Sequence, residues 1–168
     1  TVELMATNPA GTDHKTLTIT VEDPPPPPDF SSAINNSVLV FATSDDSWFA
    51  QDTVTRDGEA IQSGDIADSG MSFVETIVQG PGELEFWWRV SSEGNFDFLK
   101  FKVDGQMVEE ISGLGSWEQV SYSVGTGEHR LRWEYDKDSS DSEGSDAGYL
   151  DQISYLQLDR KSTRLNSS

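Results

Sequence analysis

The sequence predicts an all-β fold, an antiparallel β-sandwich of the jelly-roll type, on three observations. Apolar residues recur at every second position along several short segments, such as Leu84–Val90 and Leu99–Val103. Turn sequences rich in Gly, Pro, Asn and Asp separate these segments. No segment of comparable length has the 3.6-residue repeat of an amphipathic helix. About eight to ten short strands of this kind are typical of a sandwich.

Residues 1–22 predict two strands around a turn. Apolar and polar residues alternate in 2–6 and again in 17–21, and "NPAGTD" between them supplies Pro and Gly for the turn. The segment resembles the last two strands of an immunoglobulin-like domain of the kind repeated in bacterial surface proteins. That resemblance implies a neighbouring domain of which these residues are the truncated C-terminal end.

The chain then divides into three further pieces. Residues 23–28 are the linker, an Asp followed by five prolines in the sequence "DPPPPPD". Such a tract favours an extended polyproline spacer and cannot join a sheet. Residues 29–158 form the predicted sandwich domain, which is long enough for its own core. The tail 159–168, "DRKSTRLNSS", has no strand pattern and resembles a translated sequencing adapter, so we expect it to be an artefact rather than a natural basic tail.

The predicted strands of the sandwich follow one another between turn signals. "QGPGE" is expected to end one strand before Leu84, "DG" at 104–105 predicts a hairpin, and "GTG" at 125–127 predicts another turn. In chain order the expected strands are 38–42, 48–54, about 71–77, 84–90, 99–103, 107–111, 120–124, 131–135 and 149–158.

Several motifs within 43–155 are specific enough to carry a resemblance. They are a GPG turn before a strand with two adjacent Trp, "VSSE" followed by "DFL", and "LRWEYDKD" leading to "SDAG". The segment is similar to a module repeated in large secreted proteins of environmental bacteria, which itself resembles MAM-type and carbohydrate-binding jelly rolls. The resemblance implies a secreted or cell-surface binding or adhesion module, next to other domains of the same chain.

Charge and composition exclude several classes of function. The chain has a net charge of −19, and residues 29–158 hold 25 Asp and Glu against 7 Lys and Arg. This balance argues against nucleic-acid partners and anionic membranes, which both require basic surface. No apolar run approaches the ~20 residues of a membrane helix, so no membrane insertion is predicted. The chain has no Cys, which excludes disulfides and thiolate metal sites.

No catalytic residues are predicted. The sequence lacks a nucleophile elbow, a phosphate loop and a His-Glu-x-x-His motif. Two carboxylates suffice for glycoside hydrolysis, so a glycosidase is an alternative that composition alone does not exclude. A second alternative is a structural spacer with no ligand at all.

The positions of two carboxylates, Asp97 and Asp151, lead us to predict a structural calcium ion. Asp97 shares the parity of Leu99, and Asp151 shares that of Ile153, so both are expected on buried faces. A buried carboxylate requires hydrogen bonds, a cation or a raised pKa. Calcium takes six to eight oxygen ligands. Candidate ligands are Asp97, Asp151, Asp146 and Glu93, with Asn95 as an alternative loop ligand. The alternative is that each Asp accepts backbone N–H bonds at the base of a loop.

Three outward-facing residues form the candidate ligand site. Trp87 and Phe98 face outward by strand parity and could be neighbours on one face, with Arg89 beside them. Aromatic faces bind sugar rings, so the expected partner is a polysaccharide or a cell-surface glycan. The alternative, which we favour, is that Trp87 is covered by Arg89, Lys100 or the loop 58–70.

Overall fold

The structure is a computed structural model, and it describes residues 2–8, 11–17, 29–44 and 48–158. Residues 2–8 and 11–17 form two antiparallel strands, β1 (Val2–Asn8) and β2 (Gly11–Leu17). The second strand thus begins inside the expected "NPAGTD" turn, and residues 18–21 of the strand expected at 17–21 lie outside the described residues. The proline spacer 23–28 and the tail 159–168 lie outside the described residues, and the immunoglobulin-like identity of the hairpin stays a prediction. The described part contains no helix that is both long and apolar enough to cross a membrane.

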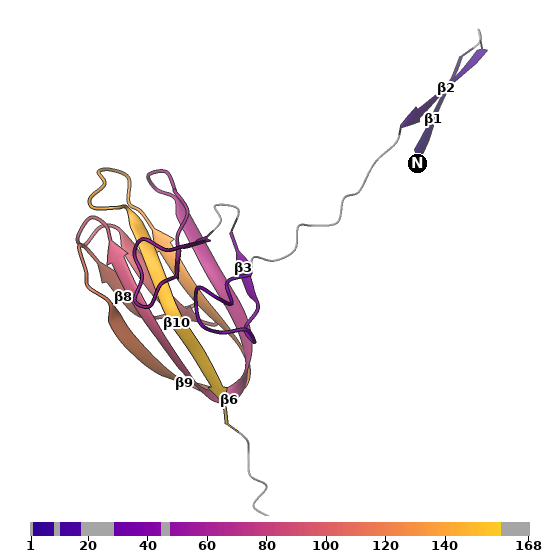
Figure 1. The fold of residues 1–168 in the computed structure, drawn as a ribbon. Helices are drawn as coiled ribbons and strands as arrows, with labels where there is room; N and C mark the ends of the chain where they lie inside the picture. The colour runs from indigo at the N-terminus through magenta and orange to yellow at the C-terminus, as the bar shows by residue number, and fades with distance from the viewer. Residues whose placement is uncertain (1, 9–10, 18–28, 45–47, 159–168) are drawn as a thin grey trace, which may run out of the picture.

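The second unit is an antiparallel β-sandwich, which confirms the predicted fold class (Figure 1). Its strands pair in the order β4-β5-β10-β6-β9-β7-β8, and β3 pairs with β6. Their bounds are β3 Phe41–Thr43, β4 Phe49–Gln51, β5 Ala60–Gln62, β6 Met71–Ser91, β7 Phe98–Val103, β8 Gln106–Ser112, β9 Glu118–Asp136 and β10 Ala147–Gln157.

Strands β6 and β9 each belong to both sheets. The half of β6 before Gly80 pairs with β3 and with the second half of β9, which also pairs with β7. The half of β6 after Gly82 pairs with β10 and with the first half of β9. The first sheet therefore contains β4, β5, β10, the second half of β6 and the first half of β9. The second sheet contains β3, β7, β8 and the remaining halves.

The prediction that "QGPGE" and "GTG" separate shorter strands was wrong. Both long strands continue through these sequences, with a register shift between Gly80 and Gly82 where they pass from one sheet to the other. The close approach there requires glycine, because a Cβ on Gly80 would lie 1.9 Å from the carbonyl oxygen of Gly125. The Gly and Pro residues do mark a place where the chain changes direction, but β6 and β9 stay paired with each other on both sides of it.

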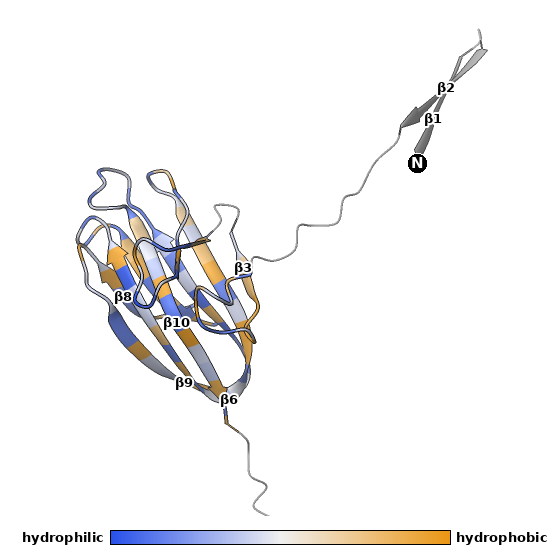
Figure 2. Ribbon diagram, viewed as in Figure 1, coloured by the Kyte–Doolittle hydropathy of each residue, from blue (hydrophilic) through white to orange (hydrophobic). Residues whose placement is uncertain are grey.

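The core lies between the two sheets and follows the predicted alternation. Hydrophobic and hydrophilic residues alternate along the strands in Figure 2. Trp133 is at the centre of an aromatic cluster, with ring centroids 5.2 Å from Phe86, 5.4 Å from Phe101 and 6.4 Å from Phe41. Trp48, Trp88 and Trp133 are all buried, as expected for core residues.

The outer face of the second sheet carries a row of ion pairs. Arg132 and Arg130 both contact Glu75 on the neighbouring strand, Lys102 pairs with Glu134, and Lys100 pairs with Asp136 at 2.8 Å. Cross-strand pairs of opposite charge stabilise an antiparallel sheet. Each basic group on this face therefore has an acidic partner within the sheet.

A hydrogen bond between His129 and Asp104, at one end of this sheet, makes the stability of the domain depend on pH. Asp104 Oδ2 lies 2.7 Å from Nδ1 of His129, and this hydrogen bond raises the pKa of His129. Folding then favours the imidazolium, so the contribution to stability is complete below about pH 6.5 and is lost as the pH rises through the raised pKa. We expect the NMR titration of His129 to show a raised midpoint in the folded protein, and Asp104→Asn to lower it. A midpoint unchanged by Asp104→Asn would contradict the assignment.

Candidate functional site

Trp87 marks the candidate site, on the outer face of the first sheet. It pairs with Asp151 of β10 on one side and with Gln119 of β9 on the other, so these three side chains leave the sheet in the same direction. The guanidinium carbon of Arg56 lies 3.2 Å from the centroid of the Trp87 ring. One face of the ring is therefore covered, by Arg56 rather than by Arg89, Lys100 or a residue of 58–70, while Trp87 stays only half-buried.

A β-bulge places Asp151 on this outer face. The register of β10 against β6 shifts between Asp151 and Ser154, and Gln152 has a φ of 50°. Parity had predicted that Asp151 and Ile153 share the core face; the extra residue of the bulge puts Ile153 in the core and Asp151 on the other side. Asp151 is nevertheless fully buried, because the loop before β5 lies over it.

The buried carboxylate of Asp151 is only partly satisfied. Its Oδ2 accepts a hydrogen bond of 2.8 Å from the backbone N–H of Arg56, whereas Oδ1 has no partner among the described residues. Burial raises the pKa of Asp151, and the charge of Asp57 raises it further. The Asp57 carboxylate itself accepts a hydrogen bond from Gln152 Nε2 at 2.9 Å. These contacts attach the loop that carries Arg56 to the sheet below it.

A pocket of about 230 Å³ opens beside Trp87 on the same face. Its lining combines one aromatic ring with amide, carboxylate and hydroxyl groups: Trp87, Gln119, Gln152, Asn35, Glu85 and Ser154, with Ile34 and Ile153. Amides offer both donors and acceptors, and a carboxylate is a strong acceptor. The pocket is smaller than the ~300–1,000 Å³ of most drug-sized sites. It combines apolar ring surface with polar groups that can bind the hydroxyl groups of a sugar.

The structure separates the other two predicted ligand residues. Arg89 leaves the same face of β6 as Trp87, opposite Tyr149 of β10. Phe98 is on β7 in the second sheet, with Lys100 5.3 Å over its ring. The expectation that Phe98 and Trp87 are neighbours was wrong, because the short connection after Ser91 crosses from one sheet to the other.

The predicted metal ligands also fall into separate places. Asp97, Glu93 and Asp146 lie at one end of the second sheet, where Asp97 Oδ1 accepts the N–H of Asp138 at 2.9 Å. Asp151 is instead bound to the Arg56 loop of the first sheet. Asp97 is fully buried, which raises its pKa, and its Oδ2 has no partner among the described residues.

A lysine ammonium lies within the acidic end of the second sheet. The side chain of Lys137 is only 4% exposed, and its Nζ contacts Asp146 Oδ2 at 2.5 Å and Asp68 Oδ1 at 3.4 Å. Asp146 also accepts a hydrogen bond from the Tyr135 hydroxyl at 2.7 Å. Burial raises the pKa of Asp146, but the bonds from Lys137 and Tyr135 outweigh it and the net pKa is lowered.

The described residues contain no cluster of three or more His, Asp or Glu arranged to hold a metal ion. Glu93, whose pKa is raised by burial and by nearby acidic groups such as Asp138, is the remaining predicted ligand at this end. In this structure the cation among these carboxylates is Lys137. The calcium ion stays a prediction.

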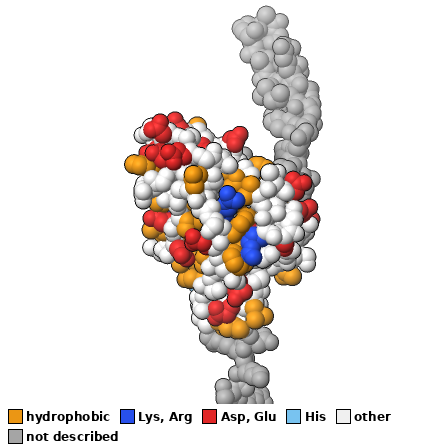
Figure 3. All heavy atoms as spheres, turned by 60° about the vertical axis from the view of Figure 1, so that its left-hand side comes forward, with side chains coloured by type: hydrophobic (Ala, Val, Ile, Leu, Met, Phe, Trp, Pro, Cys, Tyr) orange, Lys and Arg blue, Asp and Glu red, His pale blue; other side chains and the backbone are white. Residues whose placement is uncertain are grey.

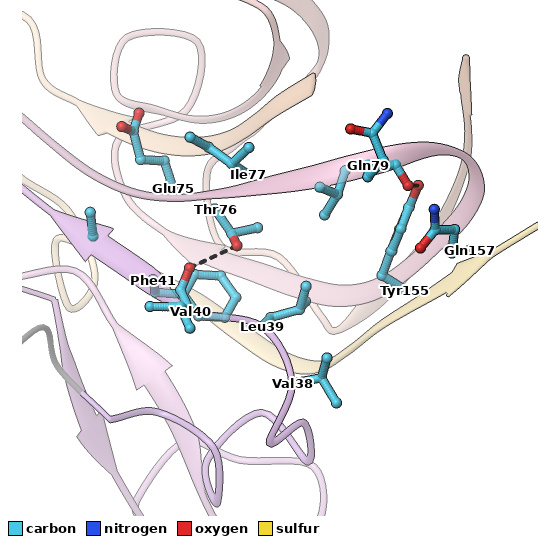
Figure 4. Close-up of a pocket in the computed structure, with 12 residues that line it drawn as sticks. Val38, Leu39, Val40, Phe41, Glu75, Thr76, Ile77, Gln79, Tyr155 and Gln157 are labelled. Atoms are coloured by element: carbon cyan, nitrogen blue, oxygen red, sulfur yellow. Dashed lines mark hydrogen bonds between the residues drawn. The ribbon is translucent and has the colours of Figure 1, made fainter. Parts of the chain in front are cut away.

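A larger cavity, of about 520 Å³, lies at the edge of the second sheet and differs in character (Figure 4). It is lined mainly by aliphatic side chains of 38–42 and of β6, and Val38 is 84% exposed. Thr76 Oγ1 donates to the carbonyl of Val40 at 2.8 Å, and the Tyr155 hydroxyl donates to the carbonyl of Gln79. Few polar side chains remain free here to recognise a hydrophilic ligand.

Comparisons with known proteins establish the fold. No family model matches the chain, and no curated protein matches it. The secreted serine protease VesC from Vibrio cholerae is similar at a TM-score of 0.63 and 19% identity, over 90% of this chain and 32% of VesC. The chain thus spans about a third of that protein.

Carbohydrate-binding modules are also among the similar structures. TmCBM61, solved with beta-1,4-galactotriose, has a TM-score of 0.46 and 13% identity, over 77% of this chain and 94% of that chain. CBM51 from Clostridium perfringens GH95, solved with methyl-galactose, has a TM-score of 0.45 and 18% identity, over 69% of this chain and 92% of that chain. With TM-scores below 0.5, these two likenesses carry no conclusion about this chain.

Proposed function

We propose that residues 29–158 form a non-catalytic saccharide-binding module of a secreted or cell-surface protein. The observation that carries the proposal is the pocket beside Trp87, where Gln119 and Gln152 from two different strands flank an aromatic ring. Sugar recognition combines apolar contact with an aromatic ring and hydrogen bonds to hydroxyls. Because Arg56 covers one face of the ring, the sugar would contact the part of Trp87 that lines the pocket.

The pocket favours binding over hydrolysis. Glycosidases place two carboxyl groups ~5–9.5 Å apart on either side of the bond that they cleave. Among the described residues that line the pocket, Glu85 is the single carboxylate. The glycosidase alternative therefore has no pair of groups here to support it.

Gln119→Ala tests the proposal. Gln119 is exposed, so its truncation is expected to leave the fold intact while removing a donor and an acceptor from the pocket. We expect affinity for a bound oligosaccharide, measured by calorimetry after a glycan-array screen, to fall about tenfold, since one or two hydrogen bonds are lost. Gln106→Ala, on exposed β8 of the other sheet, is the control and should bind normally. Silence across a broad array from folded protein would contradict the proposal.

A ligand-free spacer is the second candidate, favoured by the stacking of Arg56 on Trp87. In a spacer, this stacking would serve only to cover an aromatic ring. Arg56→Ala separates the two functions, because it uncovers the ring. A binding module should then show a changed affinity for its sugar, whereas a spacer should show only a change in stability.

Calcium belongs to the proposal as a structural ion at the acidic end of the second sheet, where Asp97 Oδ2 is buried without a partner among the described residues. Binding to the native state alone raises the melting temperature. We expect millimolar calcium to raise Tm relative to a chelator, and Asp97→Asn to abolish the rise. Equal Tm values in calcium and chelator would show that Lys137 suffices as the cation in this cluster.

A further inference from the structure

The basic residues of the sandwich divide into two groups. Residues 29–158 contain 7 Lys and Arg. Five of them form ion pairs: Lys100 with Asp136, Lys102 with Glu134, Arg130 and Arg132 with Glu75, and Lys137 with Asp146. The other two, Arg56 and Arg89, form no ion pair with any described residue. In a domain with 25 acidic residues, this leaves two cations unpaired where partners are plentiful.

Both unpaired guanidinium groups lie on the Trp87 face. Arg56 stacks on the Trp87 ring, and Arg89 leaves β6 two residues after Trp87, about 7 Å along the strand. The Nε of Arg89 is buried and has no hydrogen-bond partner in the described structure. The opposite sheet, by contrast, holds the five paired cations.

The described acidic groups near these arginines form no ion pair with them. The Asp57 carboxylate accepts a hydrogen bond from Gln152, and Asp151 accepts the backbone N–H of Arg56 rather than its guanidinium. Glu85 lies two residues before Trp87 on β6, and Arg89 lies two residues after it. The face therefore has an acidic end at Glu85 and a basic end at Arg89. In the view of Figure 3, basic side chains lie beside hydrophobic ones, with acidic side chains around them.

We infer that the saccharide recognised at the Trp87 face is acidic, with its carboxylate directed to the Arg89 end; this inference rests on the proposed function. A guanidinium group presents several N–H donors in a plane that matches a carboxylate, and it stays charged at any physiological pH. A neutral sugar would use the amides of the pocket but would leave both arginines unpaired. An oligosaccharide that lies along β6 from the pocket, with a carboxylate at the Arg89 end, would meet both sets of groups.

The test compares matched sugars on the full chain. The probes are oligosaccharides of galacturonic, glucuronic or mannuronic acid and the same oligosaccharides after reduction of their carboxyl groups. We expect at least one acidic probe to bind about tenfold tighter than its reduced counterpart, as charge-assisted hydrogen bonds predict, and to weaken as salt rises. Arg89→Gln should abolish this preference, and Arg130→Gln, an exposed arginine of the other sheet, should preserve it.

The outcomes separate this inference from the proposed function. Reduced probes that bind as tightly as the acidic ones, with binding lost in Gln119→Ala, would overturn the acidic ligand and leave the saccharide site. An acidic preference that survives both Arg89→Gln and the exposed Arg56→Gln would also overturn the inference. Absence of binding by every probe would overturn both. Near-UV circular dichroism of each variant shows that the fold is retained.

Discussion

Trp133→Ala is expected to cost the sandwich about 3–5 kcal/mol, the range for removing a large aromatic residue from a core. Trp133 is fully buried, and its ring packs against Phe86, Phe101 and Phe41, which come from strands of both sheets. Native domains are stable by only ~5–15 kcal/mol, so this single change removes a large share of the total. Urea denaturation followed by fluorescence and circular dichroism measures the loss.

Trp117→Ala is the matched control. Trp117 is half-buried and contacts Tyr149 at 6.5 Å between ring centroids, outside the core between the sheets. We expect its loss to cost clearly less than that of Trp133. Equal costs for the two substitutions would mean that the core is not centred on the Trp133 cluster.

Lys137→Met is the second change with a large expected effect. The substitution preserves most of the side-chain length but removes the ammonium, which leaves Asp146 without its partner at 2.5 Å. Only the lysine of this pair is fully buried, since the side chain of Asp146 is 27% exposed and keeps its hydrogen bond from Tyr135. The loss of a charge-assisted hydrogen bond is then expected to cost about 1.5–3 kcal/mol. We expect chemical denaturation to show a loss of about this size at pH 7.

Lys100→Met is the control for Lys137→Met, and a lower pH should partly restore stability to Lys137→Met. Lys100→Met breaks a pair whose members are 20% and 27% exposed, so its expected cost is ~0–1 kcal/mol. Lowering the pH to protonate Asp146 should reduce the difference between Lys137→Met and the wild type. A cost for Lys137→Met no greater than that for Lys100→Met would show that the acidic end is open to water.

The alternation of apolar residues was sufficient to predict the fold and most of the core. Leu84, Phe86, Trp88 and Val90 are all fully buried, as their period of two requires. The three-residue strand β5 was missed, because Ala60–Gln62 is too short to show any period. The continuity of β6 was also missed, since a Gly-Pro-Gly sequence resembles a turn whether or not the strands beside it keep their pairing.

The candidate site could be predicted only in part. Parity identified Trp87 and Arg89 as outward residues of one strand, and both lie on the same face. Parity failed for Asp151, because a bulge shifts the phase of a strand without a clear signal in the sequence. Arg56, Gln119 and Gln152 come from segments far from Trp87 in the chain. Strand pairing brings Gln119 to Trp87, and the loop between β4 and β5 brings Arg56 there, so neither could be found from the sequence near Trp87.

The passage of β6 and β9 through both sheets makes the two layers dependent on one another. If either layer opened alone, half of each shared strand would lose its partners while the other half stayed bound, so partial opening gains little chain entropy for the contacts that it loses. The amides on both sides of Gly80 should therefore exchange with solvent as one cooperative unit. A mechanical force that acts on this domain would load both layers through the same two backbones.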